Sequence, residues 1–261
     1  MSMEAYDRLV AARAKGRPSG LSYIRNIFTD FMEMHGDRRF GDDGAVVAGI
    51  ARLGDIPVTV VANEKGCGTK ERVRRNFGSA HPEGYRKALR QMKLAEKFGR
   101  PVVCFVDTAG AFCGISAEER GEGQAIAENL MGMMTLRTPV ISIFVGEGGS
   151  GGALALAVAD EVWMLENACY SVISPEGCAS ILWKDGSKAK EAARFLKITA
   201  GDLLRLKVIE RVFPEPGDFD QVYRALKSAL CRALPDKMAL DRDLLLQKRY
   251  DRFRRMGAKP L

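Results

Sequence analysis

The residues in this sequence best suited to chemistry form a glycine-rich run. Five of the seven positions from 146 to 152 are glycine, in the segment GEGGSGG. An apolar, strand-like stretch (139–145) precedes the run, and a stretch typical of a short apolar helix (152–159) follows it. Glycine permits a left-handed backbone and leaves main-chain amides uncovered, and the first amides of a helix carry the positive end of its dipole. The pattern indicates a loop that binds a phosphate or a developing oxyanion.

A glycine run of this kind can also serve three different roles. A tight packing turn between a strand and a helix requires small residues too, and it stays open as an alternative. A Walker phosphate loop requires Lys followed by Ser or Thr after the last glycine, whereas Ala153 and Leu154 follow here. A dinucleotide loop is nearer in composition and requires an acidic residue at the end of a second strand about twenty positions on. Among ligands, an oxyanion fits best.

A second segment, VDTAGAFCG (106–114), has the same position after a strand-like run and before a predicted helix. Two such loops at neighbouring strand ends can direct their amides at one carbonyl oxygen, although this segment alone would be a turn as readily as a site. A side-chain nucleophile is not indicated. The two histidines, His35 and His81, belong to no nucleophile–base pattern, and Ser150 lacks the spacing of a nucleophile elbow. We therefore expect stabilisation of charge rather than attack by a side chain.

The elements that must position these loops alternate between strands and helices. Helical spacing is found at 4–17, 21–34, 83–98 and 117–136, the last with Ser116 as a possible N-cap. Strand-like runs are found at 45–53 and 56–63, which form a predicted hairpin, and at 101–107, 139–145, 162–165, 169–173 and 208–212. Pro175 opens a further helix, and the chain after 214 is helical.

This alternation, in runs apolar enough to be covered on both faces, predicts an α/β fold with a mostly parallel sheet flanked by helices. We expect one domain over 1–261, with a helical N-terminal segment (1–36), a core (37–214) and a helical C-terminal segment (215–261).

The composition is that of an ordinary globular protein with a basic excess. Lys and Arg number 40 against 33 Asp and Glu, which gives a formal charge of +7 and favours acidic partners in general. We do not expect nucleic acid, because Phe77 and Tyr85 are the sole aromatic candidates for base stacking in the basic loop. The six cysteines form no CxxC pair, so no zinc site is predicted. Without a visible signal peptide or membrane span, we expect a cytoplasmic protein.

Four segments carry a specific resemblance to a known family. They are RRNFGSAHPEGYRKALRQMKLAEKF (74–98), DTAGAFCGISAEERGEGQAIAENL (107–130), GEGGSGGALALAVAD (146–160) and YSVISPEGCASILWKD (170–185). In this order they resemble the alpha subunits of bacterial acetyl-CoA carboxylase carboxyltransferases, and the likeness spans residues 20–215. The resemblance implies a crotonase-like fold. It departs at Ala109 and Cys113, where the family often has proline, which puts the rigidity of the second loop in doubt.

The resemblance also implies roles for particular residues. It places Gly148, Gly149, Gly151 and Gly152 in one wall of an oxyanion hole, and Gly110 and Ala111 in the other. As substrate-binding residues we expect Lys65, Arg72, Arg75 and Phe112. For the three basic residues there are two interpretations: contact with CoA phosphates or the carrier domain, or a solvated loop with no binding role. A valine at Gly151 or Gly152 is expected to abolish activity without unfolding the chain.

The implied reaction moves a carboxyl group from carboxybiotin, held on the biotin carboxyl carrier protein, to acetyl-CoA, giving malonyl-CoA for fatty-acid synthesis. It implies an alpha2beta2 heterotetramer with a beta subunit, biotin carboxylase in the full complex, and no directly bound cofactor, with zinc only in the beta chain. The alternative is the carboxyltransferase subunit of another acyl-CoA carboxylase or of a biotin-dependent decarboxylase.

Overall fold

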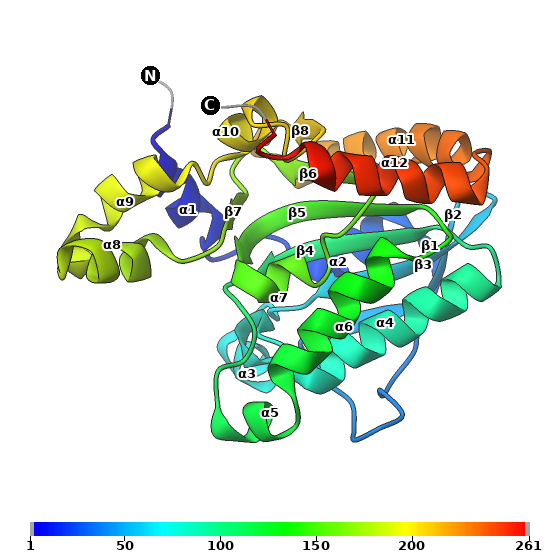
Figure 1. Cartoon of the computed structure of the whole chain (residues 1–261), viewed down its shortest axis with the longest axis horizontal. Helices are drawn as coiled ribbons and strands as arrows, with labels where there is room; N and C mark the ends of the chain where they lie inside the picture. The colour runs from blue at the N-terminus through cyan, green and yellow to red at the C-terminus, as the bar shows by residue number, and fades with distance from the viewer. Residues whose placement is uncertain (1–2, 259–261) are drawn as a thin grey trace.

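A single mixed sheet organises the chain in this computed structural model, which describes residues 3–258 (Figure 1). Its strand order is β1-β2-β3-β4-β5-β6-β8, with β7 paired to the outer half of β5. β1, β2 and β3 are antiparallel neighbours, and every other pairing is parallel. The strands are β1 Thr29–Glu33, β2 Val46–Leu53, β3 Ile56–Asn63, β4 Val102–Thr108, β5 Val140–Gly149, β6 Glu161–Leu165, β7 Cys169–Ser171 and β8 Arg211–Phe213.

Helices cover both faces of the sheet. The helices are α1 Ala5–Ala12, α2 Gly20–Ile27, α3 Thr69–Arg74, α4 Pro82–Lys97, α5 Ile115–Glu119, α6 Glu122–Met134, α7 Ser150–Leu154, α8 Pro175–Trp183, α9 Ala189–Leu196, α10 Ala200–Arg205, α11 Phe219–Met238 and α12 Arg242–Arg255, with short 3-10 turns at Asn76–Gly78 and Gly186–Lys188. α2 approaches Ala62 and α4 approaches Val46, residues whose side chains lie on opposite faces of the β2–β3 pair. All seven residues of β4 are buried as a result.

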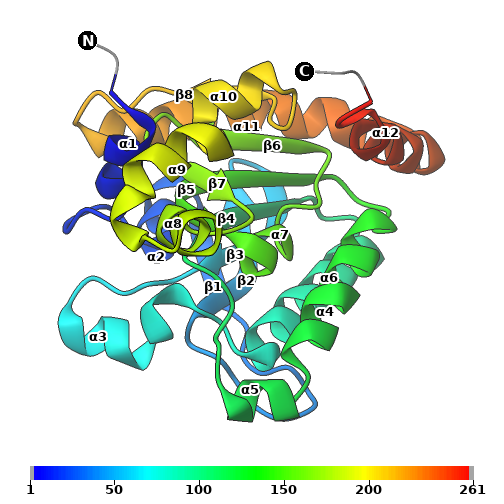
Figure 2. The ribbon, with the colours of Figure 1, turned by 60° about the vertical axis from the view of Figure 1, so that its left-hand side comes forward.

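Several local predictions are confirmed. The hairpin joins β2 to β3 in antiparallel register, the following strands pair in parallel, and Pro175 is the first residue of α8. The C-terminal segment is helical, as α11 and α12, over its described part. α8 and α9 project beside α1 as a helical arm (Figures 1 and 2).

The prediction of one helix over 21–34, and so of a wholly helical segment 1–36, is wrong. α2 ends at Ile27, the chain turns at Asp30 with φ +52°, and β1 adds to the edge of β2. The apolar spacing in this segment fits two structures equally: one side of a continuous helix, or a short buried helix followed by an edge strand. Pairing with β2, a partner distant in sequence, decides between the two. α2 itself belongs to the core, since Tyr23, Ile24 and Ile27 are fully buried.

The helix predicted at 117–136 is two helices. α5 begins at Ile115, so Ser116 is not its N-cap, and Gly121 separates α5 from α6 with φ +82°. A left-handed φ is accessible to glycine at little cost and ends the first helix. The strand predicted at 139–145 in turn continues to Gly149, because β7 pairs with it there.

Candidate oxyanion site

Two loops meet at the carboxyl ends of β4 and β5. We call residues 146–152 the glycine loop and residues 107–114 the second loop. A Cβ built on Gly149 would overlap the Ala109 carbonyl, and one on Gly152 would lie 2.5 Å from the Ala111 nitrogen. The two glycines therefore allow the backbones of the two loops to touch. The structure brings together the two segments that the sequence singles out.

The glycines of the loop differ in what surrounds them. At Gly151 an added Cβ would meet only Ile126 of α6, at an ordinary 3.6 Å, so a small side chain fits there. At Gly152 it would collide with the second-loop backbone and with the Tyr85 hydroxyl, 2.7 Å away. The expectation that valine at Gly152 leaves the fold intact is therefore wrong, because the side chain would force the two loops apart.

The hydrogen bonds of the second loop leave one amide open. Gly110 N–H donates to the Thr108 hydroxyl (3.1 Å), and Phe112 N–H donates to the Ala80 carbonyl (2.9 Å). Ala111 N–H, between them, has no acceptor within residues 3–258. Gly110, which was expected to donate to a ligand, is thus used to shape its own loop. Ala111 is the donor that this loop can offer.

The glycine loop offers amides at the start of α7. Gly148 and Gly149 belong to β5 and pair with Tyr170 and Ser171 of β7, so their part is structural. No side chain caps α7, which leaves the first-turn amides of Gly151 and Gly152 without an intrahelical acceptor. The exposed residue before them, Ser150, has φ +51°, a backbone conformation rare outside glycine. Open donors at a helix start suit an anionic oxygen.

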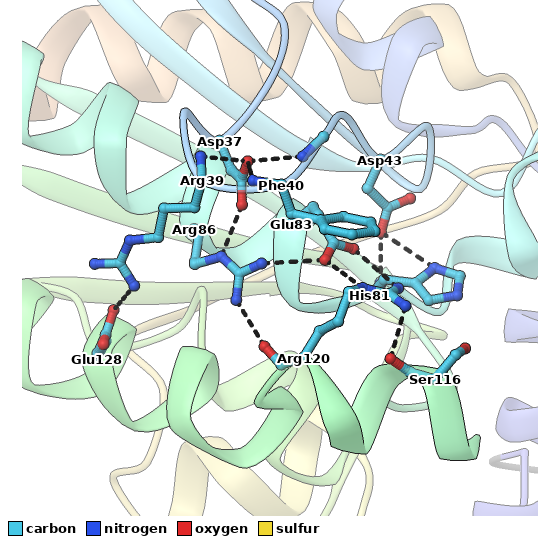
Figure 3. A network of polar contacts seen from close by, with 11 residues as sticks. Asp37, Arg39, Phe40, Asp43, His81, Glu83, Arg86, Ser116, Arg120 and Glu128 are labelled. Atoms are coloured by element: carbon cyan, nitrogen blue, oxygen red, sulfur yellow. Dashed lines mark hydrogen bonds and ion pairs between the residues drawn. The ribbon is translucent and has the colours of Figure 1, made fainter.

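The second loop contacts His81, which belongs to a polar network that includes Asp43 (Figure 3). The Phe112 ring stacks on His81 with 4.1 Å between ring centroids. His81 donates its backbone N–H to Asp43 Oδ2 at 2.5 Å, and the Asn76 amide lies 3.1 Å from His81 Nδ1. Phe112, predicted to bind substrate, is half-buried and packs against His81.

Ion pairs in the same network join α4 to the turn before α6 (Figure 3). Glu83 accepts from Arg120 Nε at 2.7 Å and from Arg86 Nη2 at 3.1 Å. Arg86 also donates to Asp37 at 2.7 Å. Burial acts to raise the pKa of Asp37, but three backbone N–H groups and Arg86 together lower it to about 2. Every cation of this network is therefore already bonded to a carboxylate.

The basic residues predicted to bind substrate are mostly engaged inside the protein. Lys65 Nζ lies 2.5 Å from the buried Asp107 carboxylate. Arg75 donates to Glu71 (3.0 Å) and to the Gly44 carbonyl (2.7 Å). Arg72 has only a 3.3 Å contact to the Gly66 carbonyl and is the cation most available to a ligand.

A cavity of about 180 Å³ lies beside the second loop and reaches Ala109. Its lining includes Lys65 and Arg72, two of the four predicted substrate-binding residues. Arg13 also lines it and holds the Glu147 carboxylate of the glycine loop through two bonds of 3.0 and 2.7 Å. Sequence reasoning missed this pair, because nothing local relates residues 134 positions apart.

Breaking the ion pair between Lys65 and Asp107 tests whether Lys65 has a structural role. We expect Lys65→Met to lower the free energy of unfolding by about 2 kcal/mol, because the buried Asp107 carboxylate loses its cation and keeps only the Glu147 backbone N–H as a donor among the described residues. The exposed neighbour substitution Lys70→Met should change it by less than about 0.5 kcal/mol. Urea unfolding of both variants measures the difference. Equal stabilities would show that Lys65 has no structural part and is free to contact a substrate.

Within residues 3–258 no group of His, Cys, Asp and Glu side chains could hold a metal ion. All six cysteines are free thiols. Among the described helices none has the length and apolar character to cross a membrane. The arrangement offers backbone donors for a negatively charged oxygen, flanked by a small basic cavity.

Comparison with known proteins identifies relatives along nearly the whole chain. The family model described as acetyl co-enzyme A carboxylase carboxyltransferase-like matches residues 1–257. The acetyl-coenzyme A carboxylase carboxyl transferase subunit alpha of Ruminiclostridium cellulolyticum is 65% identical over 256 residues, which cover 98% of each chain. A protein of Clostridium tetani named as subunits beta/alpha is 53% identical over 260 residues, covering 98% of this chain and 45% of that one.

Among solved structures, the transcarboxylase 12S crystal structure is similar with a TM-score of 0.68. The match has 21% identity and covers 84% of this chain and 42% of that chain, so it concerns the fold alone. It confirms the predicted crotonase-like α/β fold with a mostly parallel sheet.

Proposed function

Because the chain belongs to the family of acetyl-CoA carboxylase carboxyltransferase alpha subunits, we propose that its two loops form an oxyanion hole for the biotin half of the reaction. In this proposal the amides of Ala111 and of Gly151 or Gly152 hold the ureido oxygen of carboxybiotin. The beta subunit holds the thioester oxygen of acetyl-CoA on the other side of the shared site. A well-aimed amide contributes about 3 kcal/mol to such a transition state.

The proposed transfer needs no side-chain base. The carboxyl group leaves the biotin nitrogen as carbon dioxide, and the electron pair of the broken N–C bond stays on the ureido group, whose oxygen takes up the charge. The biotin nitrogen then removes a proton from the acetyl methyl group, and the resulting enolate carbon attacks carbon dioxide to give malonyl-CoA. The absence of a nucleophile–base pattern in the sequence agrees with this route.

One observation carries the proposal: the amides at the start of α7 and the Ala111 amide are open donors on two loops that touch. The oxyanion assignment is favoured over a packing turn because a packing turn alone would not require Ala111 and the α7 amides to stay without acceptors. Arg72, at the neighbouring cavity, would add positive charge for an anionic substrate group.

Assembly with a beta subunit is supported by two observations. The relative from Clostridium tetani has beta and alpha named in one chain. In addition, the helical arm and the segment that leads into it from β7 expose large apolar side chains, as expected of a surface that another chain covers. They are Val172, Ile181, Leu182 and Phe195, each more than 60% exposed. We extend the proposal to an alpha2beta2 complex that works with the biotin carboxyl carrier protein and biotin carboxylase in the cytoplasm.

Co-expression with a beta subunit tests the proposed function. We expect malonyl-CoA-dependent carboxylation of biocytin by the purified complex, and little or none by either chain alone. Replacing malonyl-CoA with methylmalonyl-CoA tests the alternative of another acyl-CoA carboxylase, and a faster reaction with it would favour that alternative. A pure, assembled complex that carboxylates biocytin with neither donor would rule the proposal out.

A further inference from the structure

Glu122, the first residue of α6, is a buried carboxyl group that nothing in the proposed reaction uses. The residue is 4% exposed, and neither Oε1 nor Oε2 has a hydrogen-bond partner in residues 3–258. A buried ionised carboxylate without a partner is very costly, and such a group normally takes up a proton instead. The position is therefore one where a neutral carboxylic acid is stable and a carboxylate is not.

The surroundings of Glu122 are acidic, and their cations are engaged elsewhere. Asp43 and Glu83 have hydrogen-bond donors of their own, while Glu118 is exposed. Arg120 is bonded to Glu83 rather than to Glu122. The charged groups that face Glu122 are Asp43, Glu83, Glu118 and Arg120. Burial is the largest cause that raises the pKa of Glu122, to about 8. The negative charges of Asp43, Glu83 and Glu118 act in the same direction, and Arg120 opposes them.

Glu122 also begins the helix that packs beside the glycine loop. One turn further along α6, on the same helix face, Ile126 lies 3.6 Å from the position that a Cβ on Gly151 would take. On the α4 side, the buried Tyr85 hydroxyl is 2.7 Å from the corresponding position on Gly152 and has no partner among the described residues. Burial raises the pKa of the Tyr85 hydroxyl, and the charges of Glu122 and Asp43 raise it further.

We propose that Glu122 is an uncharged positioning residue of the oxyanion site, and that its ionisation on α6, the helix packed beside α7, weakens the hold of the glycine-loop amides on a negatively charged oxygen. The inference rests on the proposed function of these amides. In its neutral form Glu122 adds no negative charge to α6. As a carboxylate, buried away from water, it would oppose the same anion that the amides stabilise.

The sign of the pH dependence follows from this. Glu122 is neutral at pH values below its raised pKa, so transfer is supported there, and the support is lost as pH rises through about 8. The neutral fraction of such a group falls about tenfold between pH 7 and pH 9. Glutamine, which has the same shape and no charge, should imitate the protonated acid at every pH.

The test compares rates of biocytin carboxylation by the complex with the beta subunit for wild type and Glu122→Gln between pH 6.5 and 9.5. We expect similar rates at pH 7 and a ratio of variant to wild type that rises about tenfold by pH 9. The matched control, Glu119→Gln, removes an exposed charge from the end of α5 and should follow the wild-type profile. A ratio for Glu122→Gln that stays constant with pH would overturn the proposal, as would loss of activity at pH 7 in a folded complex.

A second measurement separates this inference from the proposed function. In the full chain labelled with ¹³C-glutamate, the carboxyl resonance that disappears in Glu122→Gln should titrate near pH 8. Titration near the ordinary value for glutamate would reject the uncharged state whatever the complex does. If the resonance titrates as expected and the wild-type complex shows no transfer at all, the proposed function fails, and the catalytic part of this inference falls with it.

Discussion

Gly151→Pro is expected to slow carboxyl transfer by about 10²–10³-fold, the effect of deleting one donor from an oxyanion hole. Proline lacks the N–H group that we assign to the anionic oxygen and is well tolerated in the first turn of a helix. Gly151 is in that turn of α7, its φ is outside the left-handed region, and its Cβ position is open to Ile126 at 3.6 Å. The substitution removes a donor, but proline also restricts the residue before it, Ser150 with φ +51°, so the melting temperature of the complex is measured alongside the rate. The rate of biocytin carboxylation by the complex measures the loss.

Gly151→Ala is the matched control, because it adds the Cβ and keeps the N–H group. We expect it to retain most of the activity. If Gly151→Pro lowers the melting temperature of the complex, Ala111→Pro provides a second deletion of a donor, on the other loop, with the same expected direction. Wild-type rates in folded Gly151→Pro and Ala111→Pro complexes would show that these amides do not take part.

Arg249→Met is expected to lower the free energy of unfolding by about 3–5 kcal/mol, the usual effect of breaking a buried ion pair. Arg249 of α12 is 1% exposed and bonds both oxygens of Asp160, at 2.9 and 2.8 Å. It also donates to three carbonyls at and after the end of α6, which would lose their partner. This single side chain joins the C-terminal helix to the sheet and to α6. Chemical denaturation measures the change.

Lys248→Met is the control for Arg249→Met, because Lys248 is the exposed preceding residue of the same helix. We expect a change of less than about 0.5 kcal/mol. Equal effects of the two substitutions would mean that α12 is not anchored through Arg249.

Local sequence patterns predict the helices and strands that are determined by residues close together in the sequence. The Gly54–Asp55 turn between two apolar runs predicts the β2–β3 hairpin, and Pro175 marks the start of α8. The continuous apolar run of β4 predicts a strand covered on both faces. In each of these cases, turn chemistry and side-chain spacing act within a few residues.

Other elements depend on partners that are distant in the sequence. β1 forms because the edge of β2 is available, and the last residues of β5 are strand because β7 pairs with them. Gly121 breaks the predicted long helix although glycine inside a helical pattern is often tolerated. Periodicity within a single segment does not contain this information.

For the site, the sequence located both loops but not the individual donors. Whether the Gly110 amide is free depends on the Thr108 hydroxyl, and whether the Phe112 amide is free depends on the Ala80 carbonyl. Likewise, a basic loop looks available to substrate in the sequence, whereas a buried carboxylate distant in the chain engages Lys65. Glu122 gave no signal, because its burial follows from the packing of α6 on α4.

A crystal structure of the complex with the beta subunit and bound biocytin tests the central claim most directly. We expect the ureido oxygen to lie about 3 Å from the backbone nitrogens of Ala111 and of Gly151 or Gly152. A ureido oxygen held by side chains or by the beta subunit, with these nitrogens facing elsewhere, would contradict the assignment.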